Sequence, residues 1–109
     1  MPVMEGSTSV AANTLSANVL AGEVHQILQA NAQVSFYATG SAAGLRYSAG
    51  GGGDIIAEDA VLNANNRQPV EPDDFLVDDT FSQATPMTLR FRNTTAGALT
   101  AAWRVRVRF

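Results

Sequence analysis

The 109-residue chain contains no cysteine and no lysine, and it has a single histidine, His25. The absence of cysteine excludes disulfides, thiolate nucleophiles and cysteine-ligated zinc or iron–sulfur centres. One histidine excludes a multi-histidine metal site within one chain. Charged residues make up only 16% of the chain, where about a quarter is usual. Much of the surface is therefore expected to be neutral or covered by neighbouring molecules.

Long apolar runs and nucleotide-binding motifs are absent as well. No stretch approaches the roughly 20 apolar residues that a membrane helix needs. The segment Met1–Gly6 lacks the basic and hydrophobic regions of a signal peptide. The run Gly50–Gly53 is followed by no Gly-Lys-Ser/Thr and has no dinucleotide-type spacing. We interpret it as a flexible or tightly turning connection and not as a phosphate-binding loop.

The sequence also lacks a catalytic constellation. No Gly-x-Ser-x-Gly elbow occurs, and His25 stands among apolar neighbours, where a hydrogen-bonded structural role is expected. Adjacent acids such as Glu58 and Asp59 point to opposite faces of a strand and do not converge by themselves. We therefore expect no enzymatic activity, no catalytic residue, no metal site and no cofactor.

The charge that is present is divided unevenly along the chain. Residues 1–79 hold all ten acids and only Arg46 and Arg67, which gives −8, whereas residues 80–109 hold five arginines and no acid, which gives +5. Guanidinium groups suit bidentate contact with carboxylates or phosphates. Three alternatives stay open: a solvated face with internal ion pairs, a contact with an acidic face of another copy, or a contact with nucleic acid. The sequence pI near 4.8 disfavours nucleic acid.

Composition divides the chain into two parts. Residues 1–18 are small and polar with little periodicity, which predicts a flexible N-terminal arm that is disordered alone or ordered against a neighbour. Residues 19–109 are expected to form a single β domain. Within it, residues 19–30 fit either a short helix or an irregular strand.

Alternation of apolar and polar residues predicts strands from Gln33 onward. Residues 34–38 and 45–49 are expected to pair as a hairpin with a longer loop. Residues 54–62 fit either a strand pair or one helical turn.

The clearest expected element is a C-terminal hairpin formed by residues 87–92 and 98–109, with Arg92 opposite Ala98. Its odd positions, including Phe91 and Trp103, form an apolar face that belongs in a core. Its even positions carry all five C-terminal arginines, namely Arg90, Arg92, Arg104, Arg106 and Arg108. The last strand should be central in its sheet or pair with another molecule.

Arginines that repeat every second residue repel one another, so acidic partners are expected. The segment 70–81 supplies four candidates, Asp73, Asp74, Asp78 and Asp79. Their spacing does not match an EF-hand calcium loop. We therefore expect an acidic edge that pairs with the arginines, either within one chain or between chains.

The segment from Leu89 through Gly97 to Val105, together with the lysine-free composition and the polar N-terminal segment, resembles small structural proteins of bacteriophage virions. These are capsid decoration proteins and minor capsid or vertex proteins. The resemblance implies a β-sandwich or jelly-roll-like fold and symmetric homo-oligomeric assembly. It also implies contacts with a larger shell protein and assembly in a host cytoplasm, without enzymatic chemistry.

The expectation is thus an all-β protein, a small β-sandwich or jelly-roll-like barrel of about six to eight short strands, that serves as a structural virion component. The alternative is a non-enzymatic β module that binds a glycan or small ligand. That alternative needs exposed Tyr37, Tyr47 or Trp103, whereas the structural role buries Trp103.

Overall fold

A computed structural model describes residues 3–22, 27–28, 30–51, 54–70 and 73–109. These residues form seven strands and no helix. The strands are β1 (Val3–Val10), β2 (Ala32–Gly40), β3 (Leu45–Gly51), β4 (Asp54–Val61), β5 (Phe75–Phe81), β6 (Met87–Asn93) and β7 (Leu99–Arg108).

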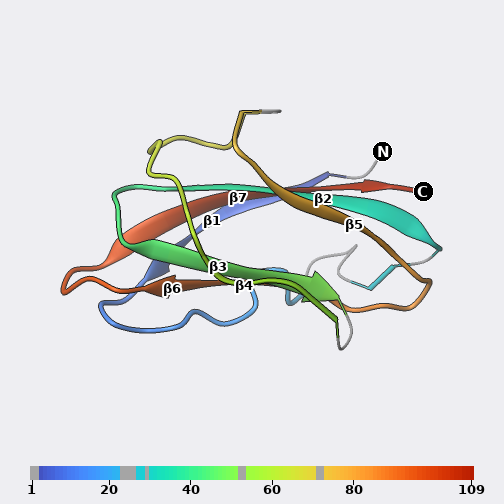
Figure 1. Cartoon of the computed structure of the whole chain (residues 1–109), viewed down its shortest axis with the longest axis horizontal. Helices are drawn as coiled ribbons and strands as arrows, with labels where there is room; N and C mark the ends of the chain where they lie inside the picture. The colour runs from blue at the N-terminus through green and yellow to red at the C-terminus, as the bar shows by residue number, and fades with distance from the viewer. Residues whose placement is uncertain (1–2, 23–26, 29, 52–53, 71–72) are drawn as a thin grey trace.

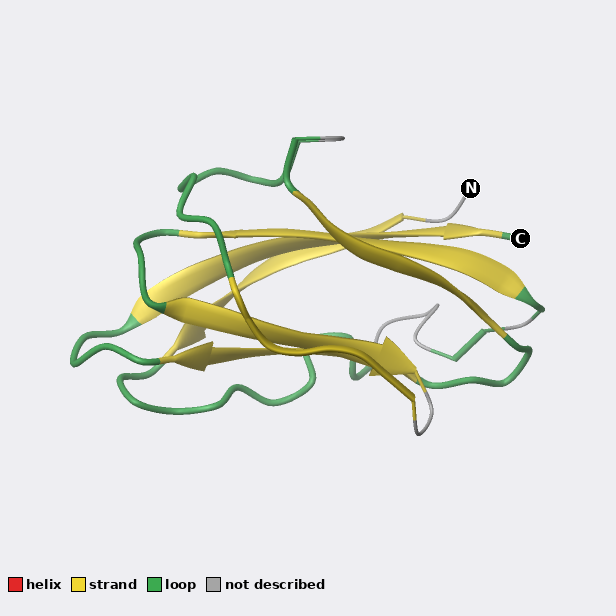
Figure 2. Ribbon diagram, in the orientation of Figure 1, coloured by secondary structure: helices red, strands yellow, loops and turns green. Residues whose placement is uncertain are grey.

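The strands form two antiparallel sheets that face each other (Figures 1 and 2). The first, called here the β7 sheet, has the order β1-β7-β2-β5, and the second, called the β3 sheet, has the order β4-β3-β6. The radius of gyration is 13.0 Å, which is the value expected for about 100 residues folded as one body. The predicted all-β class and β-sandwich architecture are confirmed.

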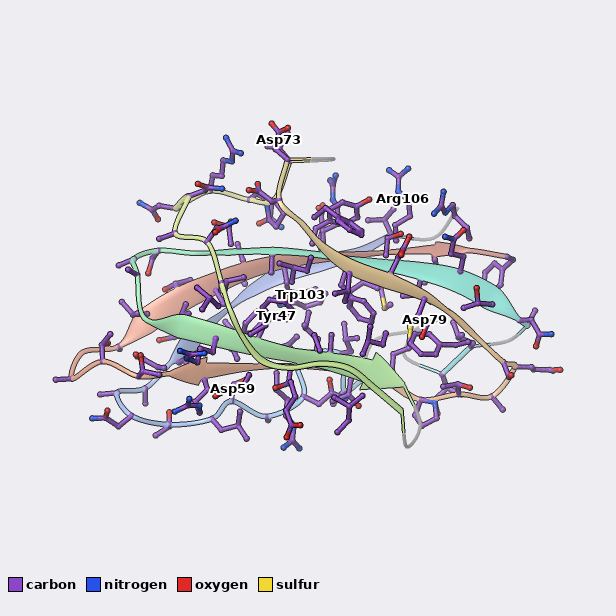
Figure 3. All side chains as sticks on the ribbon, in the orientation of Figure 1. Tyr47, Asp59, Asp73, Asp79, Trp103 and Arg106 are labelled. Carbon is purple, nitrogen blue, oxygen red and sulfur yellow. The ribbon has the colours of Figure 1, made fainter. Side chains whose placement is uncertain are left out.

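The core lies between the two sheets and follows the predicted alternation. Phe91 of the β3 sheet and Val105 and Val107 of the β7 sheet are fully buried, and Trp103 is only 4% exposed. Figure 3 shows Trp103 and Tyr47 in the space between the ribbons. Burial of side chains of this size stabilises a fold by roughly 1.5–3 kcal/mol each. The expected apolar faces of residues 87–91 and 99–107 are therefore confirmed.

The predicted pairing of these strands is wrong. β6 pairs with β3, whereas β7 pairs with β1 and β2, so the two do not form a hairpin. Residues 94–98 carry the chain from one sheet to the other. The expected hairpin of residues 34–38 and 45–49 is wrong for the same reason, because β2 and β3 lie in different sheets. Alternation specifies which face of a strand is buried but not which strand lies beside it.

The β2–β3 loop and the β6–β7 loop lie together at one end of the sandwich. Thr94 donates from its backbone N–H and from its hydroxyl to the Gly44 carbonyl oxygen, at 3.0 and 2.7 Å. Gly44 has φ of 116°, a backbone conformation that side-chain-bearing residues rarely adopt. The last strand is nevertheless central, as expected, because β7 lies between β1 and β2.

The N-terminal segment is part of the sandwich and is not a free arm. Residues 3–10 form β1, which pairs with β7 in eight consecutive antiparallel positions. Residues 13–19 then follow the edge of β6, where the Ser16 N–H donates to the Phe91 carbonyl at 2.7 Å. The Asn18 amide accepts from the Leu89 N–H and donates to the Met87 carbonyl. Short polar side chains thus replace part of a strand's backbone ladder.

Two further segments differ from expectation or are described only in part. Residues 19–22 form turns and Ile27 makes an isolated bridge to Pro86, so the described part of residues 19–30 contains no helix. His25 lies outside the described residues. Residues 54–61 form the single strand β4, which is neither a strand pair nor a helical turn. β4 pairs with β3, and the connection between them includes glycines of the Gly50–Gly53 run.

Candidate interaction surfaces

The five C-terminal arginines lie on two opposite surfaces of the molecule instead of one. Arg104, Arg106 and Arg108 alternate with the buried residues of β7, so they lie on the outer face of the β7 sheet. Arg90 and Arg92 lie on the outer face of the β3 sheet. The prediction of one shared face is wrong because β6 and β7 belong to different sheets. Figure 3 shows Arg106 and Asp59 on opposite sides of the sandwich.

Arg104 is paired by a residue of the N-terminal strand. Its Nη2 lies 2.9 Å from Oε2 of Glu5, and its Nε donates to the same oxygen at 3.1 Å. Glu5 is the residue directly opposite Arg104 in the β1–β7 register. The partner therefore comes from the segment that the sequence predicted to be a free arm.

A second ion pair lies on the outer face of the β3 sheet. The Arg92 guanidinium donates to both carboxylate oxygens of Asp59, at 2.8 and 2.6 Å. Arg46 lies directly opposite Arg92 in the register and donates to the Asp59 carbonyl at 2.9 Å. The hydrogen bond from Arg92 lowers the pKa of Asp59 below its usual value. Asp59 therefore offsets the repulsion between two adjacent guanidinium groups.

Local backbone geometry places Asp59 in this position. The β3–β4 register shifts twice, between Tyr47 and Ala49 and between Ala49 and Gly50. Asp59 has φ of 53°, a conformation that aspartate tolerates better than most residues. Its N–H donates to the Ser48 hydroxyl at 3.0 Å. The sequence reasoning missed this pair, because strict alternation through β4 contains no signal for a bulge.

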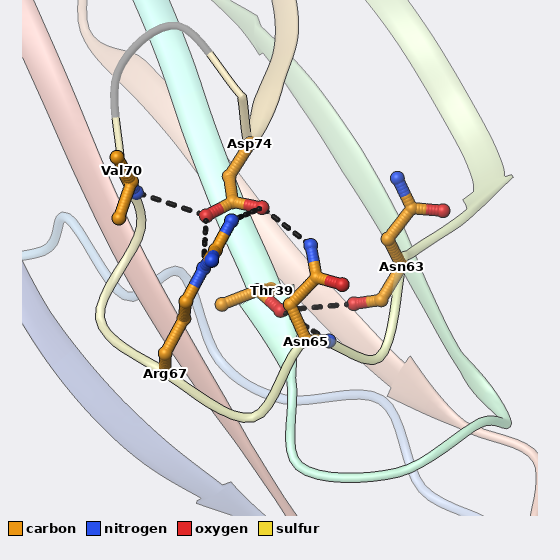
Figure 4. Close-up of polar contacts among 6 residues, drawn as sticks. All are labelled: Thr39, Asn63, Asn65, Arg67, Val70 and Asp74. Carbon is orange, nitrogen blue, oxygen red and sulfur yellow. Dashed lines mark hydrogen bonds and ion pairs between the residues drawn. The ribbon is translucent and has the colours of Figure 1, made fainter.

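Asp74 is the centre of a third polar cluster, and this cluster is buried (Figure 4). Its side chain is fully shielded from solvent, and it accepts hydrogen bonds from Asn65 at 2.6 Å, from the Val70 N–H at 2.9 Å and from Arg67 at 3.2 Å. Burial by itself raises the pKa of Asp74, but the Val70, Arg67 and Asn65 hydrogen bonds outweigh burial and lower it. Asp74 therefore fixes the conformation of the β4–β5 loop. Its ion-pair partner is Arg67 and not one of the five C-terminal arginines that were expected to pair with it.

This loop is attached to the outer face of the β7 sheet. The Thr39 hydroxyl donates to the Asn63 carbonyl and accepts from the Asn65 N–H, at 3.1 and 2.8 Å. The Gln68 side chain donates to the Trp103 carbonyl at 3.1 Å. A hollow of about 120 Å³ lies between the loop and the strands, beside Thr39, Arg67 and Thr100. Pockets for small molecules are commonly about 300–1,000 Å³, so this hollow is too small to enclose one.

The other three predicted acids are exposed. Asp78 accepts from the Gln33 side chain at 3.3 Å, and Asp79 accepts from the Thr80 N–H at 2.8 Å. No ion pair between described residues joins Asp73, Asp78 or Asp79 to an arginine.

Sheet topology explains why the expected internal ladder of acids and arginines is not formed. β2 separates β7 from β5, and Ser35 pairs with Arg106 on one side and with Asp78 on the other. Arg106 and Asp78 are therefore not directly opposite each other on neighbouring strands, the arrangement in which cross-strand charge pairs form, and no ion pair between described residues joins them.

Two of the arginines have side chains that are exposed to solvent. Arg90 and Arg108 are exposed, and within the described part of the chain neither makes a hydrogen bond or ion pair. Arg90 lies on the outer face of the β3 sheet and Arg108 on that of the β7 sheet. Each broad face therefore presents a guanidinium group that has no partner among the described residues.

The aromatic residues that a sugar-binding surface would need are buried. Tyr37, Tyr47 and Trp103 are 9%, 7% and 4% exposed. Burial raises the pKa of the Tyr47 hydroxyl. These three rings offer no stacking surface to a ligand in solution.

Among the described residues, no group of three acidic or histidine side chains is arranged to hold a metal ion, and no helix is long and apolar enough to cross a membrane. Comparison with protein-family models, with curated proteins and with solved structures finds no match to this chain.

Proposed function

We propose that this protein is a non-enzymatic structural component of a bacteriophage virion, which assembles with other copies and with a larger shell protein. The observation that carries the proposal is the placement of Arg90 and Arg108, unpaired in the described residues, on opposite broad faces. A subunit of a repeating shell has neighbours on more than one side. A guanidinium group on each face gives such a subunit a charged contact point in both directions.

The exposed acids supply complementary groups for neighbouring copies. Asp73, Asp78 and Asp79 lie on β5 or in the loop before it, at one edge of the β7 sheet. A contact between the face of one copy and the acidic edge of the next is heterologous, and such contacts build rings or extended arrays. Arg92, Arg104 and Asp74 take no part in this proposal, because each is satisfied within its own chain.

The glycan-binding alternative has less support. Its candidate stacking residues, Tyr37, Tyr47 and Trp103, are buried, and the hollow near Arg67 has no aromatic residue in its lining. Nucleic-acid binding would require the arginines to outweigh a net charge of −3.

The assembly is tested by sedimentation velocity at low salt and at about 1 M salt, where charges are screened beyond about 3 Å. We expect large species at low salt and smaller ones at high salt. The double variant R90Q/R108Q should lose the large species. Its net charge is −3 − 2 = −5, and the matched control A43E/S82E reaches the same net charge through two exposed loop positions and should still assemble.

The virion assignment needs a test of its own. Mass spectrometry of purified particles produced by the genome that encodes this chain should detect it in many copies per particle. Its absence from those particles would overturn the virion proposal. Retention on DNA that falls steeply with salt, with no self-assembly, would favour the nucleic-acid alternative instead.

A further inference from the structure

The two sheets have four edge strands, β1 and β5 in one and β4 and β6 in the other. An unpaired edge strand presents backbone N–H and C=O groups that can pair with another chain. Proteins block such edges with covering segments, bulges or charges that point inward. Among the described residues, three of these edges are blocked and the fourth, β1, is not.

The two edges of the β3 sheet are blocked by different means. Residues 13–19 cover β6, where the N–H groups of Ser16 and Val19 donate to β6 carbonyls at 2.7 and 2.9 Å. β4 carries two register shifts against β3 and has Asp59 in a positive-φ conformation. A strand with this backbone does not present a regular ladder to a partner.

The β5 edge of the β7 sheet is blocked by a bulge and by a charge. The β2–β5 register shifts between Phe36 and Tyr37. Asp79 lies opposite Val34, and Val34 is fully buried on the inner face. The Asp79 carboxylate is therefore on the core side of the edge strand, where docking of another sheet would desolvate it.

β1 has none of these features. It pairs with β7 at eight consecutive positions without a register shift, and it contains no proline and no basic residue. Within the described part of the chain, the backbone of residues 3–9 makes no hydrogen bond beyond β7, and only the Val10 carbonyl is capped, by the Asn93 side chain at 3.0 Å.

The middle of β1 is also accessible to a partner strand. Residues 6–9 are Gly, Ser, Thr and Ser, so no large side chain stands in the way. A Cβ atom at Gly6 would lie 3.0 Å from the Trp103 ring, so glycine lets this ring pack directly against the β1 backbone. Contact with Trp103 and β7 thus holds the strand in place for pairing.

We propose that β1 pairs antiparallel with β1 of a second copy about a two-fold axis, which joins two four-stranded sheets into one of eight strands. An antiparallel pair of identical strands has two-fold symmetry, so each copy uses the same edge. The one charged side chain of β1, Glu5, is neutralised by Arg104 of its own chain at 2.9 Å. Self-pairing therefore brings no uncompensated charge together. The inference deepens the proposed assembly by naming one contact within it.

Sedimentation equilibrium at about 1 M salt tests this contact, because backbone hydrogen bonds and apolar burial survive the screening of charges. We expect a dimer. Ser7 is exposed on β1. At low salt, where charges are not screened, and in the R90Q/R108Q background, S7E places a carboxylate near Glu5 or near the same substituted residue of the other copy, so this variant should be a monomer. The control S82E adds the same charge in the β5–β6 loop and should remain a dimer.

Amide hydrogen exchange on the unmodified protein gives a second readout that does not depend on any variant. In a free edge strand alternate N–H groups point to solvent, whereas in a paired strand all of them are bonded. We expect uninterrupted protection along residues 4–9 at high protein concentration and alternating protection on dilution. Alternating protection at every concentration, or a monomer at high salt, would overturn the inference.

The two proposals fail separately. A salt-resistant dimer that S7E abolishes, with no effect of R90Q/R108Q at low salt, would support the β1 contact and contradict assembly through the arginine faces. Large species that disappear at high salt without leaving a dimer would do the reverse.

Discussion

At the scale of single residues, Asp74 is the buried charged group on which stability depends. Its buried carboxylate accepts from Asn65, Val70 and Arg67. D74N keeps the shape but removes the charge and leaves donors without an acceptor. Because Arg67 is nearly half exposed and can turn to water, we expect a loss of about 2 kcal/mol in the free energy of unfolding.

Urea denaturation measures this loss, and D73N is the matched control. Asp73 is the neighbouring exposed aspartate, so its substitution should change stability by less than about 0.5 kcal/mol. Equal effects of the two substitutions would contradict the structural role of Asp74.

The pH dependence of this difference has a definite sign. The pKa of Asp74 is lower in the folded protein than in the unfolded chain, where it is about 3.9. Its contribution is therefore fully present above the unfolded pKa and is lost as pH falls through the folded pKa. The stability gap between the wild type and D74N should be constant from about pH 7 to pH 5 and shrink below about pH 4. An unchanged gap at low pH would contradict this linkage.

The sequence predicted that the repeated arginines need acidic partners, but it did not predict which residues those partners are. The expectation that repeated arginines need acidic partners holds for Arg92 and Arg104, but in the described residues it does not hold for the exposed Arg90 and Arg108. The partners Asp59 and Glu5 were not predictable. The position of Asp59 depends on a bulge in β4. The position of Glu5 depends on β1, and residues 3–10 lack the periodic alternation that predicts a strand.

At the scale of elements, the contact between the β2–β3 loop and the β6–β7 loop depends on Gly44. This residue has φ of 116°, and a Cβ atom placed there would lie 2.3 Å from the Thr95 side chain. G44A therefore combines backbone strain with a steric clash, and we expect it to cost about 2–4 kcal/mol. G97A lies in the partner loop with nothing within 4 Å of its Cβ position and should be close to neutral. Thermal unfolding monitored by circular dichroism compares the two, and similar losses of stability would contradict this account.

The existence of β2, β3, β6 and β7 and the side of each that faces the core were predictable, whereas the strands that pair with them were not. Residues 87–91 and 99–107 face the core as their alternation predicts. The expected hairpins assumed that consecutive strands pair. Here the loops after Gly40 and Asn93 cross to the opposite sheet. A loop that crosses between sheets has the same turn residues as a hairpin loop, so sequence alone did not separate them.

At the scale of the whole molecule, the chain is interwoven between the two sheets. The connections β2–β3, β4–β5, β5–β6 and β6–β7 each pass from one sheet to the other. Neither sheet is therefore a continuous stretch of chain. The same interweaving places the arginines of two consecutive strands on opposite outer faces, which is the feature on which the proposed assembly depends.

Interweaving predicts that the two sheets unfold together. Trp103, the single tryptophan, belongs to the β7 sheet but packs in the core shared with Phe91 and Tyr47 of the β3 sheet. Its fluorescence should therefore report the loss of both sheets at once. At high salt and low protein concentration, urea unfolding followed by Trp103 emission and by far-ultraviolet circular dichroism should give coincident transitions. A tryptophan transition at clearly lower urea would mean that the core opens while strand structure survives, and it would contradict a single cooperative unit.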